Sequence, residues 1–90
     1  MTLTDVRFKA ADANALQTGL LGWLTFSIGP LQVDGVTLRR TADGRTTLSF
    51  PARRDRAGRQ HFYVRPLNDD ARRVIEHQVL RALGLEEIPA

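Results

Sequence analysis

Apolar and polar residues alternate along much of the first half of the chain. In residues 3–10, apolar side chains are separated mostly by single polar or charged ones, and this period of two predicts a half-buried strand. Residues 20–28 are richer in apolar side chains and end at the pair Gly29-Pro30, a strong breaker. This second segment is expected to form the central strand, with residues 11–19 as a loop between the two strands.

Three shorter segments with the same alternation follow, at residues 36–41, 46–50 and 61–65. Short strands in direct succession favour an antiparallel meander. The apolar side chains of the first two segments share one face only if the loop between them has an odd number of residues. A three-residue loop at 42–44 meets this condition, and Gly44 at its last position accepts the left-handed conformation without steric cost.

The same parity predicts which side chains lie opposite one another. The second hairpin is expected to have its tip at residues 53–59. The expected core pairs are Leu38 with Leu48, Leu48 with Val64, and Phe50 with Phe62. On the opposite face the expected rows are Thr37, Ser49 and Tyr63, and beside them Arg39, Thr47 and Arg65.

This opposite face is polar and presents Tyr63 between Arg39 and Arg65. Such a face could stack a nucleobase on the aromatic ring while the guanidinium groups pair with phosphates. A solvated outer face with one partly covered tyrosine is the alternative interpretation, and the sequence leaves both open.

A helical period emerges only near the C-terminus. Asn68 is a suitable N-cap, and Asp69 and Asp70 suit the first turn of a helix. Apolar residues at three- and four-residue spacing predict a helix to about Leu83, with Gly84 as its C-cap. The apolar stripe, which is expected to cover the sheet, consists of Ala71, Val74, Ile75, Gln78, Val79, Ala82 and Leu83, and the side chains expected to reach water are Arg72, Arg73, Glu76 and Arg81.

These elements predict one α+β domain over residues 1–90, with an antiparallel meander of about five strands followed by an amphipathic helix. The composition, 42% hydrophobic and 26% charged, is typical of a globular domain. A chain of 90 residues has a core near the lower end of what folds comfortably alone, so a homodimer is expected.

The chain contains no cysteine, which excludes disulfides, thiolate metal sites and cysteine nucleophiles. The N-terminus lacks the layout of a signal peptide, and no apolar run approaches the roughly 20 residues needed to cross a bilayer. A cytoplasmic location is therefore expected.

Positive charge is concentrated in residues 39–65, here called the basic block. Eight arginines against two aspartates give it a net charge of +6, and because the whole chain carries +3, the remaining residues sum to −3. Such a concentrated field is typical of a polyanion partner, since arginines that neutralise phosphates release condensed counterions. Nucleic acid is the expected partner, and a merely solvated basic face is the alternative.

The hairpin tip is the candidate binding site. Arg53, Arg54, Arg56 and Arg59 project four guanidinium groups from a loop that can follow a phosphate backbone or enter a groove. Paired arginines can also contact guanine edges bidentately. The flanking candidates for nucleic-acid contact are Arg39, Arg65 and Tyr63.

A non-catalytic protein-interaction module, with the basic face against an acidic partner or assembly through a sheet edge, is the alternative function. Leu21 and Trp23 have the parity of the face opposite the core, and an outward tryptophan suits an interface. No membrane partner is expected, because the polar face of the helix has mixed charge.

Catalysis is not expected. The two histidines, His61 and His77, lie neither at a metal-ligand spacing nor beside a serine-centred motif. Asp69 and Asp70 are better explained by helix capping than by acid–base chemistry. No glycine-rich phosphate-binding loop occurs, so neither a cofactor nor a small-molecule substrate is expected.

The region from Val36 onward resembles the C-terminal half of the septation regulator family SpoVG. The family has a strand ending in Met-Pro-Ser beside basic residues, a basic loop with a glycine, a strand ending in His-Pro-Ile, and a helix with an early arginine. The matching positions here are Phe50-Pro51-Ala52-Arg53-Arg54, Gly58, Arg65-Pro66-Leu67, and Arg72 or Arg73, and the opening Thr4-Asp5-Val6-Arg7 is also similar to the family's N-terminus.

The resemblance implies a small α+β protein, typically a dimer formed by strand exchange or edge pairing. It also implies binding of DNA and RNA in the regulation of gene expression or division, with Arg53, Arg54 and Arg56 as contacts. Two positions depart from the family pattern: Ala52 stands where the family has serine, and Arg65 where it has histidine. Roles of those two family side chains do not carry over.

Overall fold

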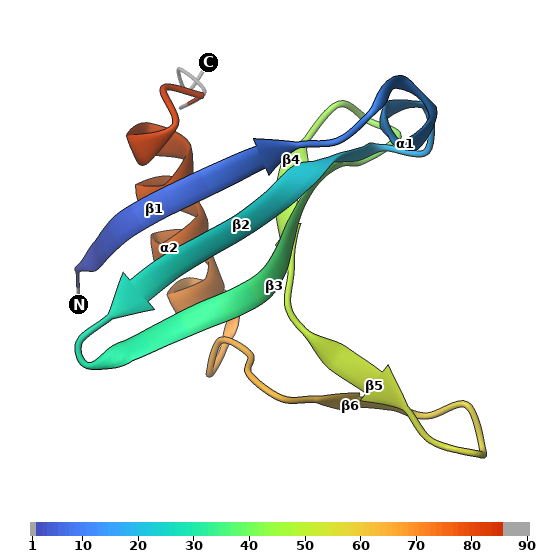
Figure 1. Ribbon diagram of the computed structural model, residues 1–90. Coiled ribbons are helices and arrows are strands. Elements are labelled where there is room, and N and C mark those ends of the chain that lie inside the picture. Colours follow the sequence, from blue (N-terminus) through green and yellow to red (C-terminus); the bar gives the residue numbers. More distant parts are fainter. Residues whose placement is uncertain (1, 86–90) are drawn as a thin grey trace.

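Eight helices and strands follow one another in residues 2–85, the part of the chain that this computed structural model describes (Figure 1). Met1 and residues 86–90 of the predicted domain lie outside the described residues. In chain order the elements are β1 (Leu3–Ala10), α1 (Ala13–Gln17), β2 (Leu20–Ile28), β3 (Leu31–Arg40), β4 (Thr46–Ser49), β5 (Ala52–Arg54), β6 (Gln60–Phe62) and α2 (Asp69–Ala82).

The predicted α+β class, with an antiparallel meander and a C-terminal helix, is confirmed. Strands β1 to β4 form one antiparallel sheet in the order β1-β2-β3-β4, so the meander has four strands rather than about five. Strands β5 and β6 pair only with each other, as a separate two-stranded sheet.

The pair Gly29-Pro30 turns the chain rather than ending the sheet. Ile28 of β2 lies opposite Leu31 of β3, so the loop between them has two residues and β3 begins well before the predicted residue 36. Gly29 has a φ of 53°, which suits the first central position of a two-residue hairpin turn, where glycine is favoured.

Residues 11–19, predicted as a loop, contain the short helix α1. The carboxylate of Asp12 caps it by accepting a hydrogen bond from the backbone N–H of Ala15 at 2.8 Å. A helix of five residues is too short for apolar side chains to recur at three- and four-residue spacing. The pattern that reveals longer helices is therefore absent here.

The register of the β3–β4 hairpin is confirmed. Leu38 lies opposite Leu48, and the backbone N–H of Thr41 donates to the carbonyl oxygen of Arg45 at 2.7 Å, which leaves the three-residue loop 42–44. Gly44 has a φ of 86°, the left-handed conformation that the odd loop length requires.

The predicted pairing of β4 with the strand that follows it is wrong. Ala52 lies opposite Phe62, so Phe62 and Val64 are not partners of Phe50 and Leu48, and they are 39% and 42% exposed. Pro51 supplies a physical reason, because it cannot donate a ladder hydrogen bond and favours the end of a strand. The chain leaves the large sheet at this point and continues as a projecting hairpin.

The core lies between the four-stranded sheet and α2, which covers one face of that sheet (Figure 1). Ile75 and Val79 are the buried residues of α2. Val74, a member of the predicted stripe, is 48% exposed, whereas Leu80 is partly buried against the core, so the covering stripe is rotated from the predicted one. The buried sheet-side residues packed with α2 are Leu3, Leu24, Phe26, Val33, Val36, Leu38, Leu48 and Phe50.

The ends of α2 agree with the prediction to within a residue. The side chain of Asn68 accepts a hydrogen bond from the backbone N–H of Ala71 at 2.8 Å, as an N-cap does. Leu83 is the C-cap, and the predicted Gly84 follows it.

In β2, the register shifts between Leu20 and Gly22, and Leu21 packs against the core instead of facing outward as predicted.

Candidate nucleic-acid interface

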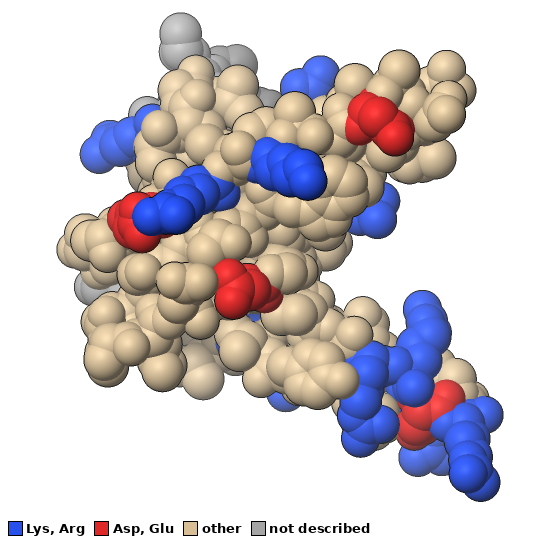
Figure 2. All heavy atoms as spheres, viewed as in Figure 1, with Lys and Arg blue, Asp and Glu red and all other residues tan. Residues whose placement is uncertain are grey.

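The hairpin formed by β5 and β6, residues 52–62, projects from the body of the molecule (Figure 1). Lysine and arginine side chains gather on it (Figure 2). Arg53 and Arg54 lie on β5, and Arg56 and Arg59 lie in the loop that joins the strands. All four are exposed. The structure therefore brings together the four arginines predicted at the hairpin tip, which we call the basic hairpin.

Asp55 organises the loop of the basic hairpin. Its Oδ1 accepts hydrogen bonds from the backbone N–H groups of Ala57 and Arg59, at 2.8 and 3.0 Å. Its Oδ2 lies 2.7 Å from Nε2 of His61 on β6. The backbone N–H groups of Asp55 and Gly58 donate to the carbonyl oxygens of Arg59 and Asp55, at 2.9 and 3.0 Å. One carboxylate thus ties together both ends of the loop.

These contacts lower the pKa of Asp55 below its ordinary value of 3.8. The hydrogen bond with His61 is the largest cause, followed by the backbone N–H of Arg59 and, more weakly, that of Ala57. Hydrogen bonds to the charged form of a carboxyl group favour ionisation. Asp55 was not among the predicted site residues, although an aspartate shortly before Gly58 is typical of a side-chain-stabilised turn.

Three guanidinium groups of the basic hairpin are free. Within residues 2–85, the side chains of Arg53, Arg56 and Arg59 make no hydrogen bond or ion pair. The Nη1 of Arg54 donates to the carbonyl oxygen of Gly58 at 3.0 Å, which fixes the direction of that side chain. A guanidinium group has five N–H donors and no acceptor, so the free groups are suited to an anionic ligand.

Tyr63 and Arg65 were predicted to lie on the large sheet, but they lie at the root of the basic hairpin, directly after β6. The backbone N–H of Tyr63 donates to the carbonyl oxygen of Pro51 at 2.9 Å, and its side chain is 68% exposed. The guanidinium of Arg65 lies 6.0 Å from the ring centroid of Phe62, within the range of a cation–π contact. Both side chains therefore belong to the projecting unit that carries the arginines.

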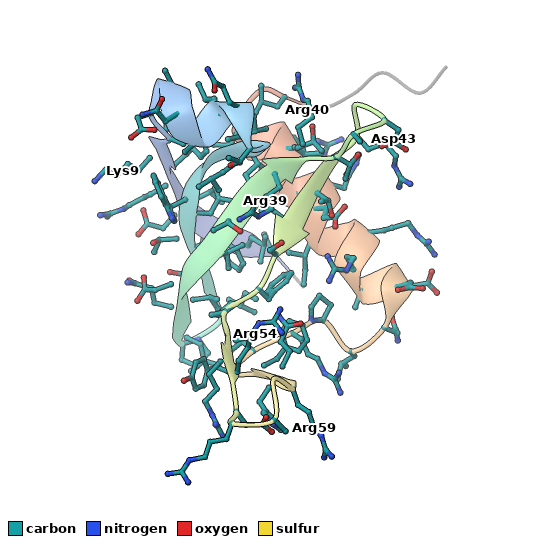
Figure 3. All side chains as sticks on the ribbon, turned by 90° about the vertical axis from the view of Figure 1, so that its right-hand side faces the viewer. Lys9, Arg39, Arg40, Asp43, Arg54 and Arg59 are labelled. Carbon is teal, nitrogen blue, oxygen red and sulfur yellow. The ribbon has the colours of Figure 1, made fainter. Side chains whose placement is uncertain are left out.

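Arg39 lies on β3 opposite Thr47, as predicted, and is exposed. Figure 3 looks onto the side of the molecule where Arg40, Arg39, Arg54 and Arg59 follow one another from the α1 end to the basic hairpin. The backbone N–H of Arg40 donates to the carbonyl oxygen of Gly19 beside α1, at 2.7 Å. The basic block is thus spread over this side of the molecule and is densest at the hairpin.

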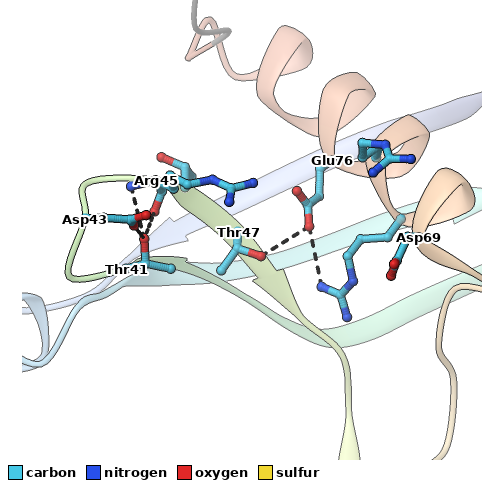
Figure 4. Close-up of a pocket in the computed structure, with 9 residues that line it drawn as sticks. Thr41, Asp43, Arg45, Thr47, Asp69 and Glu76 are labelled. Atoms are coloured by element: carbon cyan, nitrogen blue, oxygen red, sulfur yellow. Dashed lines mark hydrogen bonds and ion pairs between the residues drawn. The ribbon is translucent and has the colours of Figure 1, made fainter.

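A polar pocket of about 430 Å³ lies between the β3–β4 loop and α2 (Figure 4). The Nη1 of Arg72 donates to the carbonyl oxygen of Leu48 at 2.7 Å and lies 3.4 Å from Oε1 of Glu76. The hydroxyl of Thr47 also donates to Oε1 of Glu76, at 3.2 Å. Arg72 and Glu76 therefore join α2 to β4, in contrast to the prediction that both reach water.

This pocket has no excess of positive charge. Three arginines face three carboxylates in its lining, and Arg72 pairs with Glu76 within it. The pKa of Asp43 is lowered, chiefly by the hydrogen bond from the hydroxyl of Thr41. Because its charges balance, the pocket is a poorer site for a polyanion than the basic hairpin. Its charged residues are Asp43, Arg45, Asp69, Arg72, Arg73 and Glu76.

The histidines occupy separate positions, His61 beside Asp55 on the basic hairpin and His77 exposed on α2. In the described part of the chain, no group of three or more His, Cys, Asp or Glu side chains could hold a metal ion. No helix between residues 2 and 85 is long and apolar enough to cross a membrane.

Comparison with known proteins gave no match, whether to a family model, to a curated protein or to a solved structure. The resemblance to the SpoVG family consequently stays a prediction based on short motifs. The interpretation of the site rests on the geometry of the basic hairpin.

Proposed function

We propose that this protein is a cytoplasmic nucleic-acid-binding regulatory protein that contacts phosphates through its basic hairpin. The observation that supports this proposal most directly is the group of exposed hairpin arginines, of which Arg53, Arg56 and Arg59 have no side-chain partner within residues 2–85. A free guanidinium can donate two parallel hydrogen bonds to one phosphate. Arg39 and Arg65 would add flanking contacts.

The proposed contacts with phosphates predict how strongly binding depends on salt concentration. Four hairpin arginines would neutralise about four phosphates, and each contact on duplex DNA contributes about −0.9 to the slope of log affinity against log salt concentration. The expected slope is therefore about −3 to −4. The carboxylate of Asp55, the acidic group among these arginines, is occupied by the loop's own donors.

The shape of the hairpin supports contact with a groove as well as with the backbone. The major groove of B-DNA is about 12 Å wide and admits a two-stranded β-ribbon. Arginine side chains at such a ribbon can donate to O6 and N7 of guanine. RNA phosphates attract the same donors, so both DNA and RNA are candidate ligands.

The resemblance to the SpoVG family supports the same proposal from a different direction. It implies a regulator of gene expression or division that binds DNA and RNA. The positions that it implicates, Arg53, Arg54 and Arg56, are all on the basic hairpin.

A non-catalytic protein-interaction module is the alternative function. The observation that favours it is the 42% exposure of Trp23 on a sheet face that α2 does not cover, because large aromatic side chains are common anchors of interfaces. An acidic partner protein would then bind the side of the molecule that carries the basic block. This alternative predicts no binding to either nucleic acid at low salt.

We further propose that two copies associate through the root of the basic hairpin. Val64 and Leu67 are 42% and 95% exposed there. Together with Phe26, Phe50 and Ile75 they line an apolar pocket of about 250 Å³. A second copy over this pocket would add apolar burial to a small core. Sedimentation equilibrium should give a dimer mass, and a monomer mass at high concentration would count against association.

Charge-matched double variants test the hairpin assignment. At 0.1 M salt each phosphate contact supplies about 0.9 decade of affinity through counterion release. Replacing Arg56 and Arg59 by Gln should therefore weaken binding to labelled duplex DNA by between about ten- and a hundredfold, measured by fluorescence anisotropy. Replacing Arg45 and Arg73 by Gln removes the same charge from the polar pocket and should change the affinity less than about threefold. Equal weakening by both variants would refute the hairpin assignment.

A further inference from the structure

Trp23 lies on the face of the four-stranded sheet that is turned away from α2. The neighbouring residue Leu24 is buried in the core, and successive side chains of a strand point to opposite faces. Trp23 is 42% exposed. Its cross-strand neighbours are Lys9 on β1 and Thr37 on β3. An aromatic ring is thus presented on an open sheet surface, between two polar side chains.

Unpaired cations flank this ring. Lys9 lies directly opposite Trp23, and Arg39, two residues beyond Thr37 along β3, is a diagonal neighbour. Neither Lys9 nor Arg39 makes a side-chain hydrogen bond or ion pair within the described residues. Figure 3 shows Lys9 projecting from the side of the sheet opposite α2.

The carboxylates Asp5 and Asp34 are both bonded near Thr25, two residues along β2 from Trp23, and both are engaged. Asp5 accepts a hydrogen bond from Nε of Arg7 at 3.3 Å. Asp34, near the β2–β3 turn, accepts from the side chains of Thr25 and Gln32, at 3.2 and 3.1 Å. Among the described residues, the part of this face from Trp23 toward α1 therefore carries the unpaired charges of Lys9 and Arg39.

We propose that Trp23, Lys9 and Arg39 form a stacking site for an unpaired base of a single-stranded nucleic acid. Trp23 offers a planar surface to the base, and the two cations pair with the adjacent phosphates. Bases inside a duplex are stacked on one another and do not reach a flat sheet face. This inference rests on the proposed function and adds a second element to it: single strands stack a base on Trp23, whereas duplexes bind through the arginines without contacting this ring.

The stacking role that the sequence suggested for Tyr63 thereby moves to a different residue. Tyr63 lies on the hairpin root, whereas Trp23 occupies the large sheet between flanking cations. The chain contains a single tryptophan, so its emission reports on this site alone.

Tryptophan fluorescence of the unaltered protein is the first test. The longest dimension of the molecule is 41 Å, and a nucleic-acid strand advances about 3.4 Å per nucleotide, so a 15-nucleotide oligonucleotide can reach both the sheet face and the hairpin. A 15-nucleotide single strand of mixed sequence should quench the emission of Trp23 as it binds. The 15-base-pair duplex of the same sequence should bind, by anisotropy, without this quenching.

Paired variants give a second test. Trp23→Leu should weaken binding of the single strand by roughly 5- to 100-fold and leave duplex affinity within about twofold, because one base–aromatic stack is lost. Leu31→Ala, the loss of a 67% exposed apolar side chain at the β2–β3 turn, should change neither affinity more than about twofold. The quenching experiment uses the unaltered protein, so its result does not depend on whether Trp23→Leu folds.

Three results would overturn the stacking site. Single-strand binding without quenching would reject it while leaving the basic hairpin as a binding element. A shift of Trp23 emission with protein concentration alone would show that a second copy covers this face. Absence of anisotropy change with both polymers at low salt would remove the proposed function itself, and the stacking site with it.

Discussion

Replacement of Arg72 by Met tests how α2 is held to the sheet beside the basic hairpin. Arg72 donates to the carbonyl oxygen of Leu48 at 2.7 Å, and its guanidinium lies 5.7 Å from the ring centroid of Phe50. It also lies 3.4 Å from Glu76. Leu48 and Phe50 are the last buried residues before the chain leaves for the basic hairpin. Methionine keeps much of the apolar stem and removes these polar contacts.

The individual contacts give the expected magnitude. A hydrogen bond from a charged donor contributes about 1.5–3 kcal/mol, and a cation–π contact adds about 0.5–1 kcal/mol. The pair with Glu76 at i and i+4 adds only about 0.3–0.5 kcal/mol. The Arg72 side chain is 35% exposed, so water replaces part of each contact in the variant. We expect a net loss of about 2 kcal/mol, which corresponds to a fall in Tm of roughly 8–16 °C for a domain of this size.

Urea denaturation followed by circular dichroism measures this loss, and Arg73→Met is the matched control. Arg73 neighbours Arg72 on α2, but its side chain is 70% exposed and its partner Asp70 is 87% exposed. Surface ion pairs of this kind contribute about 0–1 kcal/mol. If Arg72→Met and Arg73→Met differ by less than about 0.5 kcal/mol, the proposed link between α2 and β4 does not contribute to stability.

Three further perturbations follow from local geometry. Asn68→Ala should lower the free energy of unfolding by about 1 kcal/mol in urea denaturation, because the N-cap hydrogen bond to α2 is lost. Gly22→Ala should cost about 2–3 kcal/mol in the same assay, since its Cβ would lie 2.3 Å from the carbonyl oxygen of Lys9 and 2.5 Å from the ring of Phe8. Because the pKa of Asp55 is lowered, the order that its carboxylate gives the loop should persist at and above pH 3.8 and be lost as the pH falls further. The backbone amide resonances of Ala57 and Arg59, followed in an NMR pH titration, would report this loss of order.

Each of these three expectations has an outcome that contradicts it. An Asn68→Ala protein as stable as the unaltered chain would show that the cap is not made in solution. A change below about 0.5 kcal/mol in Gly22→Ala would mean that the strands move apart at little cost. Retention of the Ala57 and Arg59 amide shifts down to pH 2, or an unchanged acid transition in Asp55→Asn, would exclude Asp55 as the organiser of the loop.

Parity could predict the register of β3 and β4 from the sequence because a buried face tolerates no one-residue slip. Leu38 and Leu48 are both almost wholly buried, so this pairing followed from the apolar pattern alone. The same reasoning failed after Phe50, where Pro51 interrupts the ladder. The apolar pattern of residues 61–65 resembles a core strand, yet Phe62 and Val64 are partly exposed on a separate unit.

The candidate site was predictable in composition but not in arrangement. Clustering of Arg53 to Arg59 in the sequence identified the basic hairpin, because residues of one loop stay close in space whatever the fold. Sequence proximity did not reveal that Asp55 receives donors from Ala57, Arg59 and His61, since this depends on the conformation of the loop. Nor did it show that Arg72 turns toward β4, because that contact depends on the packing angle of α2.

The salt dependence of binding tests the central claim most directly, because its slope measures how many phosphates are neutralised, and we propose that the basic hairpin neutralises about four. Fluorescence anisotropy with labelled duplex DNA, titrated from low to moderate salt, should give a slope of about −3 to −4 in log affinity against log salt concentration. The double variant Arg56→Gln and Arg59→Gln should reduce the magnitude of that slope by about 1.8, and the control variant Arg45→Gln and Arg73→Gln should leave it unchanged. A slope near zero, or an equal reduction by both variants, would contradict nucleic-acid binding through the basic hairpin.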